Sequence, residues 1–202
     1  MTEQSDRTGP DPADDPMDSG PPTMTGAAVR PGSIGVAIAI PEPYGSQLQT
    51  MRSSFGDPLA NAIPTHVTLL PPTALNPGGL DVVSDHLEKV AADHDPFDMH
   101  LRGSATFRPV SPVVFVQLSK GIGECEFLER DVRDGPLGTR TLDFPYHPHV
   151  TVAHHLPEDV LDAAQKRAAD FECSFVVDGF QLYLHGDDGV WRVARDFWFG
   201  SP

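Results

Sequence analysis

Two short segments of the chain carry a histidine and a threonine at the same spacing. His66 precedes Thr68 by two residues, and His149 precedes Thr151 by two residues, each time among apolar and β-branched neighbours. Such runs are typical of β-strands, in which every second side chain points to the same face of the sheet. Each segment therefore predicts an imidazole and a hydroxyl group side by side on one face of a sheet.

This pair of groups, present twice, suits the hydrolysis of a phosphodiester. The reaction needs one group that deprotonates water and one that protonates the departing oxygen, and imidazoles do both near neutral pH. Threonine hydroxyls can donate hydrogen bonds to the non-bridging phosphate oxygens. A single His-x-Thr tripeptide is common, but two copies 83 residues apart in similar surroundings favour a shared site. We therefore predict His66 and His149 as catalytic residues, and Thr68 and Thr151 as phosphate-binding residues.

The composition limits the class of protein and its partners. The chain has 202 residues, 39% of them hydrophobic, and a formal net charge of −15. A protein that holds long nucleic acid through its phosphates needs a basic surface, so we expect a short end or a nucleotide as any nucleic-acid partner. The apolar stretches are too short to cross a bilayer and the acidic start does not resemble a secretory signal, so we expect no membrane association and a cytoplasmic location. Cys125 and Cys173 are expected to stay reduced in the core.

The order of the predicted elements indicates an α+β fold with an internal repeat. Residues 1–32 are acidic and rich in Pro and Gly, which predicts a disordered tail, and residues 33–202 are expected to form one domain. Hydrophobic periodicity predicts strands at 35–40, 66–70, 97–101, 105–107, 113–118, 149–153, 174–185 and 190–199, and helices at 43–55, 79–93, 121–133 and 157–171. The pattern of a His-Thr strand, a helix and further strands occurs twice. We therefore expect two similar α+β lobes, each offering one His-Thr strand to a shared cleft.

The paired motifs resemble those of the two-histidine phosphoesterase superfamily, in particular its branch of 2′-5′ RNA ligases and RNA 2′,3′-cyclic phosphodiesterases. The matching stretches are His66-Val67-Thr68-Leu69 and His149-Val150-Thr151-Val152, and the similarity covers most of residues 33–202. The resemblance implies a bilobal fold whose two pseudo-symmetric lobes have antiparallel sheets that face a central cleft. We expect a monomer, because both lobes belong to one chain.

The same resemblance implies a reaction without metal or cofactor. A 2′,3′-cyclic phosphate, at the 3′ end of an RNA or in a small cyclic nucleotide, would be opened to a 2′-phosphomonoester. His66 would protonate the leaving oxygen and His149 would activate water, while Thr68 and Thr151 would bind the phosphate oxygens. The same groups could run the reverse reaction, a 2′-5′ ligation.

Other residues near the second motif leave alternatives open. His147, His149 and His155 would share one face of an extended strand, as ligands of Zn²⁺ could, but the first and last lie roughly 26 Å apart along such a strand. We favour Tyr146, His147 and His155 at the rim of the cleft, with Tyr146 as the candidate for stacking on a nucleobase. A different class of function is a non-catalytic module of the same fold that binds a nucleotide or phosphate.

Overall fold

The computed structural model describes residues 32–76, 78–138 and 144–200, so the predicted tail at residues 1–32 lies outside them except for its last residue. Within these ranges, eight antiparallel strands form one sheet. Their order across the sheet is β6 (Glu172–Val177), β3 (Phe97–Thr106), β4 (Val113–Lys120), β5 (His149–His154), β2 (His66–Ala74), β1 (Ser33–Ala39), β7 (Gly179–His185) and β8 (Trp191–Trp198). The first strand begins at Ser33, where the sequence predicted the fold to start.

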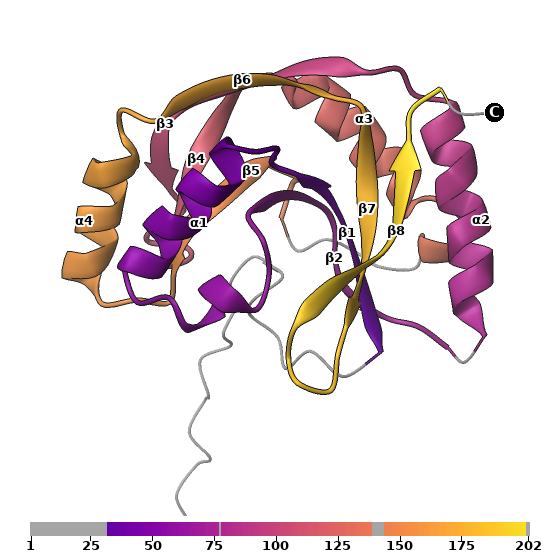
Figure 1. The fold of residues 1–202 in the computed structure, drawn as a ribbon, viewed down its shortest axis with the longest axis horizontal. Helices are drawn as coiled ribbons and strands as arrows, with labels where there is room; N and C mark the ends of the chain where they lie inside the picture. Colours follow the sequence, from indigo (N-terminus) through magenta and orange to yellow (C-terminus); the bar gives the residue numbers. More distant parts are fainter. Residues whose placement is uncertain (1–31, 77, 139–143, 201–202) are drawn as a thin grey trace, which may run out of the picture.

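The sheet consists of two similar halves that meet between β2 and β5. One half contains β6, β3, β4 and β5, and the other contains β2, β1, β7 and β8. The register between β2 and β5 consists of a single pair, Val67 with Val150, whereas the pairings inside each half extend over several residues. The α+β class and the two similar halves predicted from the sequence are therefore confirmed, with the two expected sheets joined into one curved sheet (Figure 1).

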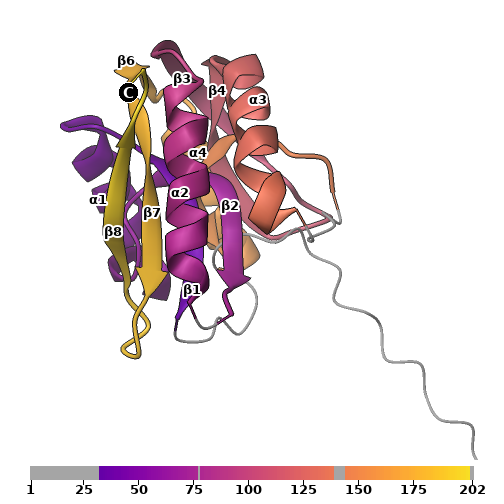
Figure 2. The ribbon, with the colours of Figure 1, turned by 90° about the vertical axis from the view of Figure 1, so that its right-hand side faces the viewer.

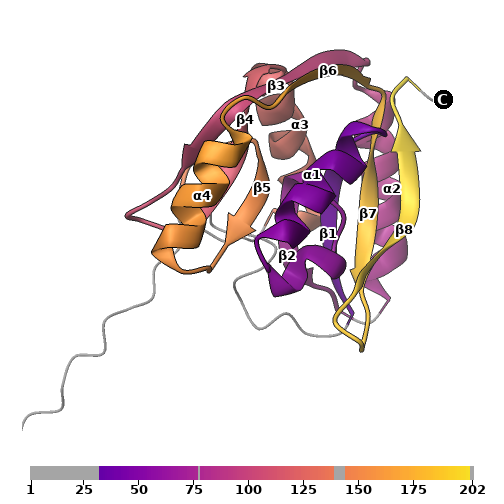
Figure 3. The ribbon, with the colours of Figure 1, turned by 60° about the vertical axis from the view of Figure 1, so that its left-hand side comes forward.

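In the described part of the chain, four helices cover the sheet: α1 (Tyr44–Ser54), α2 (Gly79–Ala92), α3 (Ile122–Arg133) and α4 (Glu158–Ala168), with short 3₁₀ turns at Pro58–Asn61 and Gly135–Leu137. Helices α2 and α3 pack against each other and lie together in Figure 2, while α1 and α4 both pack on β5 and come forward in Figure 3. Helix α1 follows β1 but contacts β5, and α3 follows β4 but contacts β2. Each half is thus held to the other by a helix as well as by the sheet.

Two strands continue past the ends that the sequence predicted. Strand β2 runs through Pro71 and Pro72 to Ala74, because a bulge in its pairing with β1 accommodates prolines that would interrupt a regular ladder. The predicted strands 97–101 and 105–107 are one strand, β3, whose pairing with β4 shifts register between Leu101 and Ser104.

The predicted strand at 174–185 is wrong as a single element. It divides at Asp178 into β6 and β7, which pair with different neighbours. Strand β6 pairs with β3 in one half of the sheet, and β7 pairs with β1 and β8 in the other. The β-propensity is continuous from β6 to β7, so the sequence does not show that the chain passes from one half of the sheet to the other between them.

The helices pack on the sheet through apolar side chains. On α3, Leu128 and Val132 are buried, whereas the Phe127 ring is exposed and lies under the Arg130 guanidinium. Cys125 and Cys173 are buried free thiols, as predicted. Among the described helices, none is both long and apolar enough to span a bilayer.

Candidate active site

The pair formed by Val67 and Val150 brings the two His-Thr segments together at the centre of the sheet. Both valines are fully buried, while the histidine and threonine that flank each of them are half-buried on the opposite face. Because the strands are antiparallel, each histidine lies beside the threonine of the other strand. On such a pair, the two histidines are diagonal neighbours, with Cβ atoms somewhat less than about 7–8 Å apart. The two imidazoles therefore lie near each other on one face of the sheet.

The two imidazoles are anchored in the same way. The Nδ1 atom of His66 lies 2.7 Å from the Pro64 carbonyl oxygen, and the Nδ1 atom of His149 lies 2.7 Å from the His147 carbonyl oxygen. A carbonyl oxygen only accepts hydrogen bonds, so Nδ1 is the donor and carries the proton in both neutral rings. The Nε2 atom of each ring therefore keeps its lone pair for accepting a proton.

Both imidazoles are neutral at pH 7. Burial is the main cause that lowers the pKa of His66 to about 4, and the Arg52 and His149 charges lower it further. Burial likewise lowers the pKa of His149 to about 4, with the neighbouring His147 imidazole acting in the same direction. In both rings the hydrogen bond to the carbonyl opposes this shift. A bound anion would raise both pKa values, so a phosphate would bring a proton into the site.

The surroundings of the two histidines differ. On β1, Ala39 pairs with His66, whereas on β4, Gln117 pairs with His149. The threonines differ in the same way, since Ala37 pairs with Thr68 and Phe115 pairs with Thr151. The site is therefore lined by small side chains near the first histidine and by large ones near the second.

Aromatic rings enclose His149. The Phe107 ring meets it edge-on, with 5.0 Å between ring centroids and 90° between the planes, and the Phe115 ring lies 5.1 Å away. Phe107 and Phe115 also contact each other, with ring centroids 4.3 Å apart. From the sequence, both rings are candidates for stacking on a nucleobase or for core packing, and the alternation along 113–118 places Phe115 on the face that its strand shares with Gln117.

The family follows from a comparison over most of the chain. Residues 40–189 match the model of the 2′-5′ RNA ligase superfamily. The chain belongs to this superfamily. A Bacillus cereus relative named “Putative phosphoesterase” is 28% identical over 172 residues, which cover 83% of this chain and 97% of the relative. A Bacillus thuringiensis relative with the same name matches to the same extent.

Two solved structures share the fold of this chain. LigT of E. coli, crystallised with 3′-AMP, is 18% identical with a TM-score of 0.64, and the match covers 85% of this chain and 100% of LigT. TT0787 of Thermus thermophilus is 21% identical with a TM-score of 0.61, and the match covers 84% of this chain and 98% of TT0787. The bilobal α+β fold that the sequence indicated is thus shared with LigT and TT0787.

Of the three residues expected at the rim of the cleft, His147 lies beside His149. Its side chain is exposed, and its ring stacks next to that of His149 with 6.3 Å between centroids. His155 lies past the far end of β5, six residues from His149, which corresponds to about 20 Å along a strand. His155 therefore does not lie beside the His66 and His149 imidazoles.

Tyr146 has a different position from the expected one. Its hydroxyl donates to the Thr68 carbonyl oxygen at 2.9 Å, and its ring packs against the core. Burial raises the pKa of Tyr146 well above its usual value, with acidic groups of α3 acting in the same direction. The hydroxyl thus supports the backbone of β2. Because the ring packs against the core, it does not offer a free face for stacking on a nucleobase.

The histidines around β5 do not converge. Within the described residues, no three His, Cys, Asp or Glu side chains form a group that could hold a metal ion. The zinc alternative fails because His147 and His155 lie at opposite ends of β5.

Proposed function

We propose that the protein hydrolyses the 2′,3′-cyclic phosphate of a small nucleotide or of a short RNA 3′ end and releases a 2′-phosphomonoester. One observation carries the proposal: two imidazoles with identical Nδ1 anchors flank the Val67–Val150 pair, each beside a threonine. Two proton-transfer groups and two hydroxyl donors close together on one face of the sheet meet the needs of this reaction.

The proposed reaction is an in-line displacement at phosphorus. His149 accepts a proton from water through Nε2 while the water oxygen bonds to phosphorus, and the bond from phosphorus to the 3′ oxygen breaks. His66, protonated in the complex because the phosphate anion raises its pKa, donates its proton to the 3′ oxygen. Thr68 and Thr151 donate hydrogen bonds to the non-bridging oxygens. Which histidine is acid and which is base is carried over from the family resemblance.

The charge of the chain and its relatives' ligands both favour a small substrate. The net charge is −15, which opposes the binding of long RNA through its phosphates. LigT of E. coli has been crystallised with 3′-AMP, with phosphate and with ATP. We therefore propose a nucleoside 2′,3′-cyclic phosphate as the substrate, with 2′-5′ ligation as the reverse reaction, acting as a monomer.

The test is incubation of the purified protein with adenosine 2′,3′-cyclic phosphate in EDTA, with the product resolved by chromatography. The expected product is 2′-AMP. The variants His66→Ala and His149→Ala are expected to lose about 10²–10⁴-fold in rate. His100→Ala is the matched control, because His100 lies on β3 in a contact with Glu172 at the outer part of the sheet.

Each other outcome contradicts a definite part of the proposal. Release of 3′-AMP would show that the other phosphorus–oxygen bond breaks. Unchanged rates in both histidine variants would reject the two-imidazole mechanism. Nucleotide binding without turnover would instead identify a non-catalytic binding module.

A further inference from the structure

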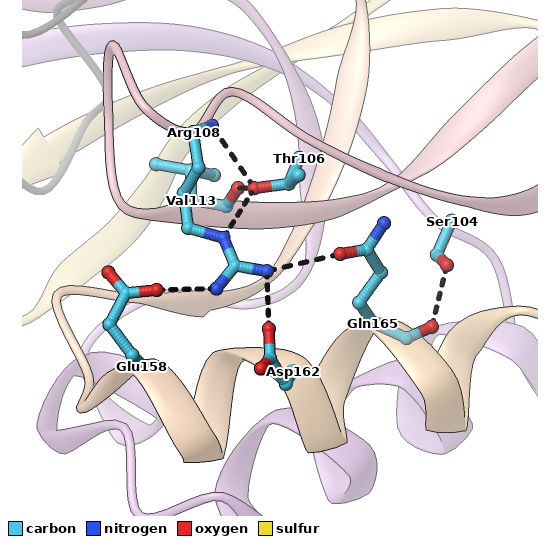
Figure 4. Close-up of polar contacts among 7 residues, drawn as sticks. All are labelled: Ser104, Thr106, Arg108, Val113, Glu158, Asp162 and Gln165. Carbon is cyan, nitrogen blue, oxygen red and sulfur yellow. Dashed lines mark hydrogen bonds and ion pairs between the residues drawn. The ribbon is translucent and has the colours of Figure 1, made fainter.

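Arg108 ties the turn between β3 and β4 to helix α4. Its Nη1 donates to Glu158 at 2.6 Å, and its Nη2 lies 2.9 Å from Asp162 and 3.1 Å from the Gln165 side chain (Figure 4). These three partners recur at spacings of four and three residues, so they lie on one face of α4. The Arg108 Nε and backbone N–H both donate to the Thr106 hydroxyl at 3.2 Å.

The guanidinium of Arg108 is committed to this network. Its side chain is 17% exposed, and its polar atoms contact two carboxylates, an amide and a hydroxyl. Two carboxylates offset its positive charge. Arg108 is therefore not arranged as a free cation that attracts a substrate phosphate, although it lies next in sequence to a residue of the site.

The network continues to His149 through Phe107. Thr106 donates through Oγ1 to the Val113 carbonyl at 2.7 Å, and the Phe107 N–H donates to the same carbonyl at 3.1 Å. These bonds close the turn between β3 and β4 and fix the residue that carries the ring. The Phe107 ring then packs edge-on against His149.

We propose that Arg108 is a positioning residue, which fixes the β3–β4 turn on α4 and so holds the Phe107 ring edge-on against the imidazole of His149. The role of His149 as the reacting base rests on the function proposed above. The ring keeps water from one side of the imidazole and limits its rotation, so that Nε2 stays aimed at the phosphate position. Catalysis depends strongly on such fixed orientation.

The charges around His149 do not include that of Arg108. The charged group that lowers the pKa of His149 is the imidazole of His147 beside it on the chain. His149 itself lowers the pKa of His66 on β2 and of His154 further along β5. On β4 its neighbours Phe115 and Gln117 carry no charge. Arg108 thus affects His149 through packing, and its loss must act by exposing the imidazole to water.

The first test measures the pKa of His149 in the ligand-free protein by NMR titration. Burial lowers this pKa to about 4, so exposing the ring moves it upward toward 6.5. Arg108→Ala and Phe107→Ala are both expected to raise it, and the double variant is expected to raise it no further than Phe107→Ala. Arg102→Ala, at an exposed residue of β3, is the control and leaves it unchanged. An unchanged pKa in folded Arg108→Ala would overturn the proposal.

The second test separates positioning from substrate binding. The double variant Glu158→Gln and Asp162→Asn keeps Arg108 but removes the charges that hold it. Positioning predicts a fall in kcat of about 10-fold with KM changed less than about twofold, and partial recovery of kcat in Arg108→Lys relative to Arg108→Ala. An arginine that binds the substrate would instead gain a free charge in the double variant, and a lowered KM would contradict the proposal.

The two tests also separate this proposal from the function proposed above. The NMR titration needs no turnover, so it decides the role of Arg108 even for a protein that fails to open cyclic nucleotides. Conversely, normal turnover in Arg108→Ala would reject the positioning role while leaving the reaction intact. Circular dichroism and thermal unfolding confirm that each variant is folded before either measurement.

Discussion

Val67 of β2 pairs with Val150 of β5, and this single pair sets the geometry of the site. The residues on either side of it are the four predicted from the sequence. An antiparallel pair places each histidine next to the threonine of the opposite strand, so both halves contribute to any phosphate bound there. The consequences can be tested one residue at a time.

Replacing either threonine hydroxyl with a methyl group should weaken catalysis without disturbing the strands. We expect Thr68→Val and Thr151→Val each to lower kcat/KM by on the order of 10²-fold, because each removes one donor to the phosphate oxygens. Valine is β-branched like threonine and preserves the strand. Steady-state kinetics with a cyclic nucleotide measures the effect. Thr73→Val, on the outer part of β2, serves as the control, and equal losses in all three variants would argue for a structural cause.

Anion binding should strengthen as the pH falls. Burial lowers the pKa of His66 and His149 to about 4, so both are neutral at pH 7, and a bound anion raises these values. Binding therefore takes up protons, and affinity for sulfate should rise as the pH decreases from about 8 to about 5. Sulfate keeps its charge over this range, so the protein supplies the pH dependence.

Titration calorimetry in buffers of different ionisation enthalpy measures both the affinity and the proton uptake. His66→Gln and His149→Gln should each reduce the uptake. Sulfate affinity that is independent of pH in the unmodified protein would show that no imidazole gains a proton on binding.

The buried pair of Arg52 and Asp57 should be important for stability. Their side chains are almost fully buried, with Arg52 Nε 2.7 Å from the Asp57 carboxylate. Arg52→Ala leaves that carboxylate buried without its cation, so we expect a loss of about 3–5 kcal/mol in the free energy of unfolding. Urea denaturation measures it. Arg195→Ala, which removes an exposed ion pair with Glu88, should cost no more than about 1 kcal/mol.

Arg52→Ala should also change the pKa of His66 in the candidate active site. The Arg52 charge lowers the pKa of His66, so Arg52→Ala should raise that pKa. NMR titration of the ligand-free variant tests this, and a further decrease in the pKa would contradict the assigned direction.

The Tyr146 hydroxyl should matter through the backbone of β2. Tyr146→Phe removes the bond to the Thr68 carbonyl and leaves that acceptor unsatisfied, at a cost of about 1–2 kcal/mol in unfolding free energy. We expect kcat/KM to fall several-fold as well, because Thr68 loses its support. Tyr44→Phe, which keeps the ring contact with Phe175, is the control. A Tyr146→Phe protein with unchanged stability would show that the bond is replaced by water.

Strand alternation explains why the site could be predicted. The burial pattern is the same in both segments, with the histidine and threonine half-buried and the intervening valine buried. This pattern depends only on the two-residue period of a strand, which the local sequence specifies. The separation of Ser174–Val177 from the strand that follows could not be read in this way, because β6 and β7 have similar β-propensity and differ only in their partners.

By itself, the sequence determined that each histidine shares a face with the threonine of its own segment and that two similar segments carry these pairs. The tertiary structure decided that Val67 and Val150 pair, that Ala39 pairs with His66, that two aromatic rings contact His149, and that Arg108 is held by α4. The physical reason is the distance along the chain between the residues that interact. A strand's alternation is set by neighbouring residues, whereas strand pairing and helix docking depend on contacts between residues far apart in the chain, and only packing of the whole core selects those contacts.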